Sequence, residues 1–142
     1  MGAGVLFFDK AGHILLIKPS YKEYWGIPGG VVDQGESPRA AAIREVKEEI
    51  NLNIESPRFI GVEYYPNLNN DKGESLQFMF YGGMLTPDEI SQIRLHPTEI
   101  SEYQFVDLKT ALDLVSDRMA QRLPPSVAAI SAKVPIYREA LE

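Results

Sequence analysis

The stretch from residue 29 to residue 52, GGVVDQGESPRAAAIREVKEEINL, constrains this chain more than any other. It begins as a glycine-rich turn and continues as a predicted helix. Ser37 is the expected N-cap, and Pro38 suits the first helical position, where no N–H is needed. The helical period places one apolar face on the core. That face carries Ala42, Ile43, Val46 and Ile50.

A second face of the predicted helix is acidic, with Glu45, Glu48 and Glu49 on one arc and Arg44 at its edge. Each like-charge pair at this spacing costs a helix roughly 0.2–0.5 kcal/mol. The plainer interpretation is a solvated acidic face. A bound hard cation would instead turn the repulsion into attraction, because Mg²⁺ prefers oxygen ligands. The residues around the helix decide between the two interpretations.

The spacing of this stretch is specific. Gly30 is followed after five residues by Glu36, after seven more by REVKEE at 44–49, and after one more by Asn51 and an apolar residue. This pattern resembles the Nudix box, which reads G, five residues, E, seven residues, R-E-apolar-x-E-E-x-G-apolar. The second glycine of the box is Asn51 here. That glycine ends the helix in a left-handed conformation, which asparagine also adopts, so the change concerns helix termination and no ligand.

The resemblance implies a metal site. Glu45, Glu48 and Glu49 would bind one or more Mg²⁺ ions, with Mn²⁺ as a substitute. The backbone carbonyl of Gly29 would be a further ligand, although a glycine pair often marks only a tight turn. Glu36 would either reach the metal through water or interact with the positive end of the helix dipole, and we favour the dipole.

The resemblance also implies a proton acceptor, for which members of the family use different residues. Glu48 and Glu99 are the first candidates. Glu102 is a second candidate near the predicted strand at 103–106, and we favour Glu99 over it. Arg44 would either orient a box glutamate or contact phosphate, and we favour orientation because it lies beside the carboxylates.

Three aromatic residues are candidates for substrate binding. Trp25 lies in the run WGIPGG, which resembles the segment that leads into the box. Tyr64 and Tyr81 lie in predicted strands and would stack on a nucleobase, although aromatic residues in strands more often pack in the core. His13, beside a predicted turn, is expected on the surface.

The order of predicted elements implies an α/β fold, a Nudix-like α/β/α sandwich with a mixed β-sheet, formed as a single Nudix domain over residues 1–142. A break is expected at 123–125, where two prolines follow a leucine. The predicted elements are hairpin strands at 5–8 and 14–17, buried on both faces, a strand at 31–32, the helix at 38–50, hairpin strands at 59–65 and 76–81 with a loop at 66–74 between them, a helical turn at 86–89, a strand at 103–106, and helices at 107–115 and 127–134.

Composition narrows the classes of function. The chain has 142 residues, a formal charge of −6 and no cysteine, which excludes disulfides and thiolate metal sites. The sequence has no basic patch of the kind that binds nucleic acid, so we expect no nucleic-acid polymer as a partner. No apolar run approaches the ~20 residues that span a bilayer, and no signal peptide is recognised, so we expect no membrane and a cytoplasmic location. The apolar run at 5–8 follows the start so closely that a segment upstream is one expectation.

The expected function is Mg²⁺-dependent hydrolysis of a phosphoanhydride bond in a nucleoside diphosphate linked to another moiety, by metal-activated water. The alternative is a non-catalytic Nudix domain that binds nucleotide metabolites as a sensor or regulator. Such proteins often lose box glutamates, and all are present here. Candidate substrates are ADP-ribose and other nucleotide sugars, oxidised deoxynucleoside triphosphates, dinucleoside polyphosphates and coenzyme diphosphates. Many members of the family pair, so a homodimer is one expectation.

Overall fold

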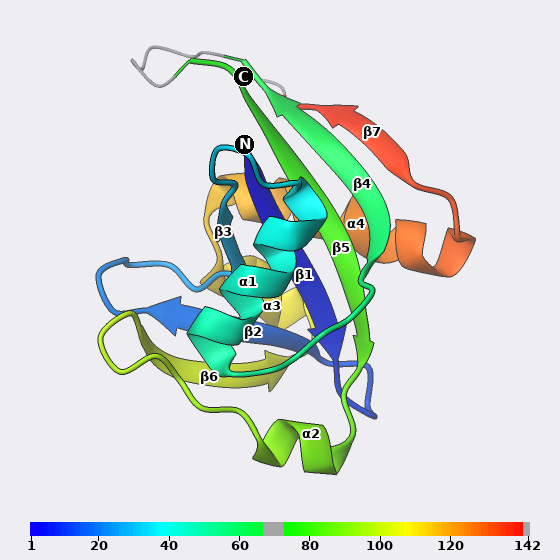
Figure 1. The fold of residues 1–142 in the computed structure, drawn as a ribbon. Coiled ribbons are helices and arrows are strands. Elements are labelled where there is room, and N and C mark those ends of the chain that lie inside the picture. Colours follow the sequence, from blue (N-terminus) through cyan, green and yellow to red (C-terminus); the bar gives the residue numbers. More distant parts are fainter. Residues whose placement is uncertain (67–72, 141–142) are drawn as a thin grey trace.

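The computed structural model describes residues 1–66 and 73–140 (Figure 1). Most of the loop predicted at 66–74 lies outside them. In chain order, the elements are β1 (Gly2–Phe8), β2 (Ile14–Pro19), β3 (Gly29–Val31), α1 (Pro38–Ile50), β4 (Arg58–Tyr65), β5 (Ser75–Met84), α2 (Pro87–Ser91), β6 (Ile100–Val106), α3 (Leu108–Leu114), α4 (Asp117–Ala132) and β7 (Ile136–Glu139).

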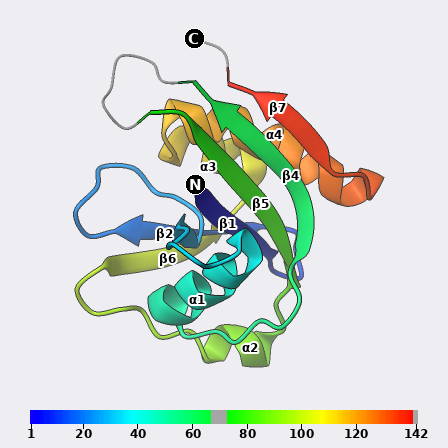
Figure 2. The same cartoon turned by 45° about the horizontal axis from the view of Figure 1, so that its top comes forward.

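The seven strands form one mixed sheet. Its order is β6-β2-β1-β5-β4-β7, and the short β3 pairs with β1. The pairs β1–β5 and β4–β7 are parallel, and the other pairs are antiparallel. Helix α1 lies on one face of the sheet, and α3 and α4 lie on the other (Figures 1 and 2). The mixed α/β/α fold predicted from the sequence is confirmed.

The central strand β1 shows why the apolar runs are continuous. Val5 and Phe7 belong to the core cluster beneath α1, whereas Leu6 belongs to the cluster beneath α3 and α4. All three side chains are fully buried. Because helices cover both faces of the strand, neither set of alternating side chains meets water.

Helix α1 begins and ends as the sequence predicts. The Ser37 hydroxyl accepts a hydrogen bond from the Ala40 N–H, and Asn51 ends the helix with a left-handed φ of 62°. The apolar face is shifted slightly from the prediction. Ile43 is only half-buried, whereas Ala41, which was not assigned to that face, is fully buried.

The break expected at 123–125 is wrong, and so is a last helix that begins at Val127. Helix α4 is continuous from Asp117 to Ala132, with both prolines inside it. Proline removes a hydrogen bond and normally costs a helix interior about 3 kcal/mol. Here Leu123 and Ala129 are buried in the core under the sheet, and this packing outweighs the lost bonds. Tertiary contacts therefore override local propensity in α4.

Two further features of the sheet concern its edges and its middle. Strand β7, which the sequence did not reveal, adds a parallel edge beside β4 with Gly61 opposite Ile136. In β5, Gly82 is the extra residue of a bulge against β1, and a Cβ there would lie 2.3 Å from the Phe7 ring.

The predicted helical turn at 86–89 is α2, closed by a capping box. Within the described residues, no helix has both the length and the apolar character needed to cross a membrane.

Candidate active site

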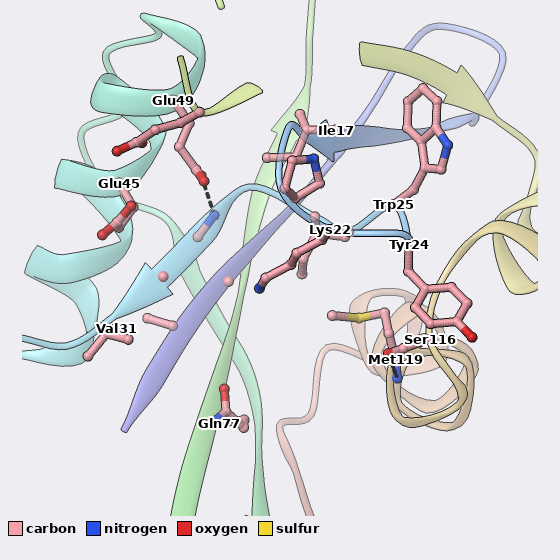
Figure 3. A pocket seen from close by; sticks show the side chains of 18 of the residues that line it. Ile17, Lys22, Tyr24, Trp25, Val31, Glu45, Glu49, Gln77, Ser116 and Met119 are labelled. Atoms are coloured by element: carbon pink, nitrogen blue, oxygen red, sulfur yellow. Dashed lines mark hydrogen bonds between the residues drawn. The ribbon is translucent and has the colours of Figure 1, made fainter. Parts of the chain in front are cut away.

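A cavity of about 720 Å³ opens between α1, the segment that joins β2 to β3, and the start of α4. Glu45 and Glu49 on α1 line one wall (Figure 3). Gly29 and Gly30 of β3 lie beside them, and Glu99 reaches the same cavity from the turn before β6. The fold thus brings together residues 70 positions apart in the chain, from Gly29 to Glu99.

The three acids predicted on one arc of α1 do not share one environment. Glu45 and Glu49 line the cavity, whereas the Glu48 side chain is 50% exposed and is not part of the lining. Positions 45 and 49 are one helical turn apart, so their side chains lie one above the other.

The two glycines of β3 make room for these carboxylates. The Gly29 N–H donates to Glu49 Oε1 at 2.8 Å. Gly29 has a φ of 150°, and a Cβ there would meet the Ala3 carbonyl oxygen at 2.2 Å. A Cβ on Gly30 would lie 2.5 Å from the carboxyl carbon of Glu45. Both positions therefore need glycine, for close packing against β1 and for space beside α1.

Arg44 binds the Glu45 carboxylate of the cavity wall and two carboxylates outside the cavity lining, those of Glu36 and Glu48. Its Nε and Nη2 donate to the two oxygens of Glu36 at 2.9 and 3.0 Å. Its Nη1 donates to Glu45 at 2.9 Å and to Glu48 at 3.3 Å. These hydrogen bonds lower the pKa of Glu36 to about 2 and raise the pKa of Arg44 further above its usual value. The guanidinium is thus committed to carboxylates, as an orienting residue would be.

Burial disfavours the charged forms of the two carboxylates in the cavity. It raises the pKa of Glu49 to about 8, with the charges of Glu45 and Glu99 adding to the effect and the Gly29 N–H opposing it. Burial also raises the pKa of Glu45, against the opposing effect of Arg44. A pair of carboxylates that resist ionisation is an environment in which a cation would be strongly favoured.

The donor set suits a hard cation, although the side chains are not yet arranged around one. Within residues 1–66 and 73–140, no three His, Asp or Glu side chains are grouped closely enough to hold a metal ion. Arg44 engages two of the acids, and Gly29 engages one oxygen of Glu49. The available donors are carboxylate oxygens, which Mg²⁺ prefers, and the missing side chain of Gly30 lets the Glu45 carboxylate lie against β3.

The two later glutamates are separated by the fold. The Glu99 backbone carbonyl accepts from the Ser20 N–H at 2.8 Å, which fixes its turn against the end of β2. Its side chain lines the cavity. Glu102 is exposed in β6 opposite Lys18, and it does not line the cavity.

The three aromatic candidates are also separated. Trp25 lines the cavity (Figure 3), whereas Tyr64 and Tyr81 do not. The Tyr81 ring packs 6.0 Å from the Phe8 ring, on the core side covered by α3 and α4. Tyr64 is half-buried in β4. His13 is half exposed and lies 3.7 Å from the Asp9 carboxylate, outside the cavity.

Several residues of the cavity were not singled out from the sequence. Lys22 and Tyr24 come from the polar segment before Trp25, and their position beside that residue was the one available signal. Gln77 comes from β5 and Arg122 from α4. Arg122 gave no signal, because the last helix was predicted at 127–134 and Arg122 precedes that range.

Comparison with known proteins identifies the family. A model of the NUDIX domain matches residues 1–129, so the chain belongs to the Nudix family. The RNA pyrophosphohydrolase of Pelagibacter ubique is 30% identical over 129 residues, which cover 82% of this chain and 81% of that protein. The putative 8-oxo-dGTP diphosphatase of Bacillus subtilis (strain 168) is 36% identical over 83 residues, which cover 58% of this chain and 52% of that protein.

A solved structure shares the fold of this chain. A Caenorhabditis elegans Ap4A hydrolase, solved as a binary complex, superposes with a TM-score of 0.73 at 24% identity, covering 92% of this chain and 97% of that one. The matches together place the chain among the Nudix hydrolases, as an enzyme.

Proposed function

We propose that the chain catalyses Mg²⁺-dependent hydrolysis of a phosphoanhydride bond in a nucleoside diphosphate linked to another moiety. The observation that carries the proposal is the convergence of Glu45, Glu49 and Glu99 on one cavity, beside glycines that let the backbone approach the carboxylates closely. Cleavage of a phosphoanhydride requires neutralised phosphate charge, an oriented water and a base. In the cavity, Glu45 and Glu49 would hold the metal that neutralises phosphate charge and orients water, and Glu99 would be the base.

Glu45 and Glu49, joined by Glu48 once it is released from Arg44, would hold the metal. When bound, Mg²⁺ offsets phosphate charge and makes water a better nucleophile. Arg44 keeps the Glu45 carboxylate turned toward the cavity through its Nη1 hydrogen bond. Glu99 reaches the cavity from the turn before β6. We assign it as the proton acceptor, with Glu48 as the alternative.

Lys22 is our candidate for a direct contact with substrate phosphate. Its side chain extends into the cavity from the segment between β2 and β3 (Figure 3). Its ammonium group offers three donors to a phosphate that the carboxylates alone would repel. Trp25 and Tyr24 lie on the same side of the cavity and offer flat apolar surfaces to a nucleobase.

The substrate class follows from what the relatives have in common. The names of the matched proteins refer to 8-oxo-dGTP, to pyrophosphate hydrolysis on RNA and to Ap4A, so each name implies linked phosphates. The individual substrates differ, so we carry over only a nucleoside with a phosphoanhydride bond. The cavity volume of about 720 Å³ suits a ligand of nucleotide size.

A phosphate-release screen with Mg²⁺ tests the proposal. The panel contains nucleoside triphosphates and their oxidised forms, nucleotide sugars, dinucleoside polyphosphates, coenzyme diphosphates with and without a phosphate on the ribose, and 5′-triphosphorylated RNA. We expect turnover of at least one member, and a decrease of roughly 10²–10⁴-fold in Glu49→Gln with the fold intact by circular dichroism.

The exposed Glu102→Gln variant is the matched control and should retain full turnover. Wild-type rates in Glu49→Gln would reject the assignment. A wild-type chain that binds panel members and cleaves none would instead favour the non-catalytic nucleotide-binding alternative.

A further inference from the structure

The cavity continues beyond the acidic wall. A second cavity of about 620 Å³ lies between the N-terminus, the end of β4, the start of β5 and the start of α4. Five residues line both cavities, so the two form one groove. The shared residues are Val31, Gln77, Ser116, Met119 and Arg122. Figure 3 shows Ser116 and Met119 across the space from Glu45 and Glu49.

Arg122 is fixed at the junction of the two cavities. Its Nε donates to the buried carboxylate of Glu63 at 3.1 Å, and its Nη2 donates to the Tyr65 hydroxyl. The side chain is only 11% exposed, and its Nη1 donates to no other residue in the described part of the chain. A guanidinium held in this way loses little freedom when it binds a further acceptor.

Arg118 adds a second guanidinium to the same place. It lies one helical turn before Arg122 on α4, with its Cζ 4.7 Å from the centre of the Tyr65 ring. The Cζ of Arg122 lies 5.1 Å from the same ring. Both arginines line the second cavity, and Arg118 is exposed there. One tyrosine thus aligns two cations on a single wall of the groove.

Within residues 1–66 and 73–140, the acids near this wall balance its positive charge only in part. Glu63 is one carboxylate, and it pairs with Arg138 of β7 as well as with Arg122. Arg118 adds a guanidinium nearby, over the Tyr65 ring, without forming an ion pair with Glu63. Glu74 also lines the second cavity, but it is exposed and lies just before the start of β5. A surplus of cations around a largely desolvated pair favours an incoming anion.

We propose that Arg118 and Arg122 form a binding site for a second phosphoryl group of the substrate, carried by the nucleoside away from the diphosphate that is cut. This inference rests on the proposed function, which assigns the diphosphate to the acidic wall at Glu45 and Glu49. The preferred substrate is therefore a nucleoside diphosphate derivative that bears a further phosphate on its ribose.

Calorimetric titration with nucleotide products tests the site without turnover. Adenosine 2′,5′- and 3′,5′-bisphosphate are compared with adenosine 5′-monophosphate in the presence of Mg²⁺. We expect at least one bisphosphate to bind the wild-type chain roughly tenfold more tightly than the monophosphate. Arg118→Gln and Arg122→Gln should each abolish this preference and leave monophosphate affinity within about twofold.

Arg138→Gln is the matched control, because Arg138 shares the Glu63 carboxylate but lines neither part of the groove. It should lower thermal stability and keep the preference, as expected if only the groove arginines contact the ligand. If Arg122→Gln does not fold, the exposed Arg118→Gln carries the test. Equal binding of all three nucleotides by the wild-type chain, or an unchanged preference in Arg118→Gln, would overturn the inference.

The two proposals fail separately. Phosphate release in the substrate screen without any preference for bisphosphates would remove the arginine site and leave the hydrolase. A preference for bisphosphates in a chain that cleaves no member of the screen would support the arginine site and count against the hydrolase.

Discussion

Gly30 decides where the Glu45 carboxylate lies. A Cβ at this position would fall 2.5 Å from the carboxyl carbon of Glu45, so Gly30→Ala must displace that side chain. The displaced group is the end of a flexible side chain, and the fold should survive. We expect Mn²⁺ affinity, measured by calorimetry, to fall roughly 10–100-fold, as when a group that positions a metal ligand is lost.

Gly26→Ala is the control for this substitution, since a Cβ on Gly26 would meet no atom within 4 Å. It should keep both thermal stability and Mn²⁺ affinity. Equal Mn²⁺ affinity in Gly30→Ala and the wild-type chain would show that Glu45 does not need its present position.

Glu49 makes the stability of the metal-free chain depend on pH. Its pKa is raised from 4.5 to about 8 by burial, so between these values the folded chain keeps a proton that the unfolded chain has released. The stability from this group is complete below pH 4.5 and is lost as pH rises through 8. With EDTA present, we expect the melting temperature of Glu49→Gln to exceed that of the wild-type chain increasingly from pH 4.5 to pH 8.

Glu36 provides the opposite case. Its pKa is lowered from 4.5 to about 2, chiefly by hydrogen bonds from Arg44, so its contribution is present above pH 4.5 and is lost as pH falls toward 2. Glu36→Gln should therefore melt below the wild-type chain at pH 7 and approach it in acid. Parallel pH profiles for both variants and the wild-type chain would contradict both assignments.

At the scale of secondary-structure elements, the end of α1 explains why the box tolerates asparagine. Asn51 holds a φ of 62°, its backbone N–H donates to the Lys47 carbonyl, and its side chain accepts from Lys47 Nζ at 2.9 Å. Asn51→Ala places an ordinary side chain in the left-handed region and should cost about 1 kcal/mol by urea denaturation. Asn51→Gly should be close to neutral. An alanine variant as stable as wild type would mean that the cap contributes nothing.

Helix α4 shows where local signals mislead. Two adjacent prolines normally predict a helix end, and here the helix continues because Leu123 packs fully buried in the core. The functional consequence is that Arg118 and Arg122 lie on one continuous helix, one turn apart. Both arginines precede the prolines. The sequence predicted no helix over residues 117–122, and so it gave no reason to place the two arginines together at the cavity.

At the scale of the whole molecule, the sheet order brings Glu99 to the box. Strand β6 pairs with β2, β2 pairs with β1, and β1 pairs with β3, and so the turn before β6 reaches the cavity next to α1. If Glu99 accepts the proton, Glu99→Gln should lower kcat by roughly 10²–10⁴-fold with little change in KM. Glu102→Gln, three residues further along the chain and within β6, should behave as wild type. Full activity in Glu99→Gln would move the base to Glu48.

The sequence by itself determined the features that depend on local periodicity and spacing. The box helix, its caps at Ser37 and Asn51, the apolar strands buried on both faces and the mixed α/β class could all be read from patterns within about 25 residues. The family could be read as well, because the box fixes residue types at fixed separations.

Only the tertiary structure decided which of the candidate residues share a cavity. It separated Glu48 from Glu45 and Glu49, separated Glu102 from Glu99, and kept Trp25 while leaving Tyr64 and Tyr81 elsewhere. It also added β7, and with it the Glu63 network beneath the groove. The reason is physical: which side chain reaches a common space depends on strand order and packing between segments far apart in the chain, and no local period encodes these.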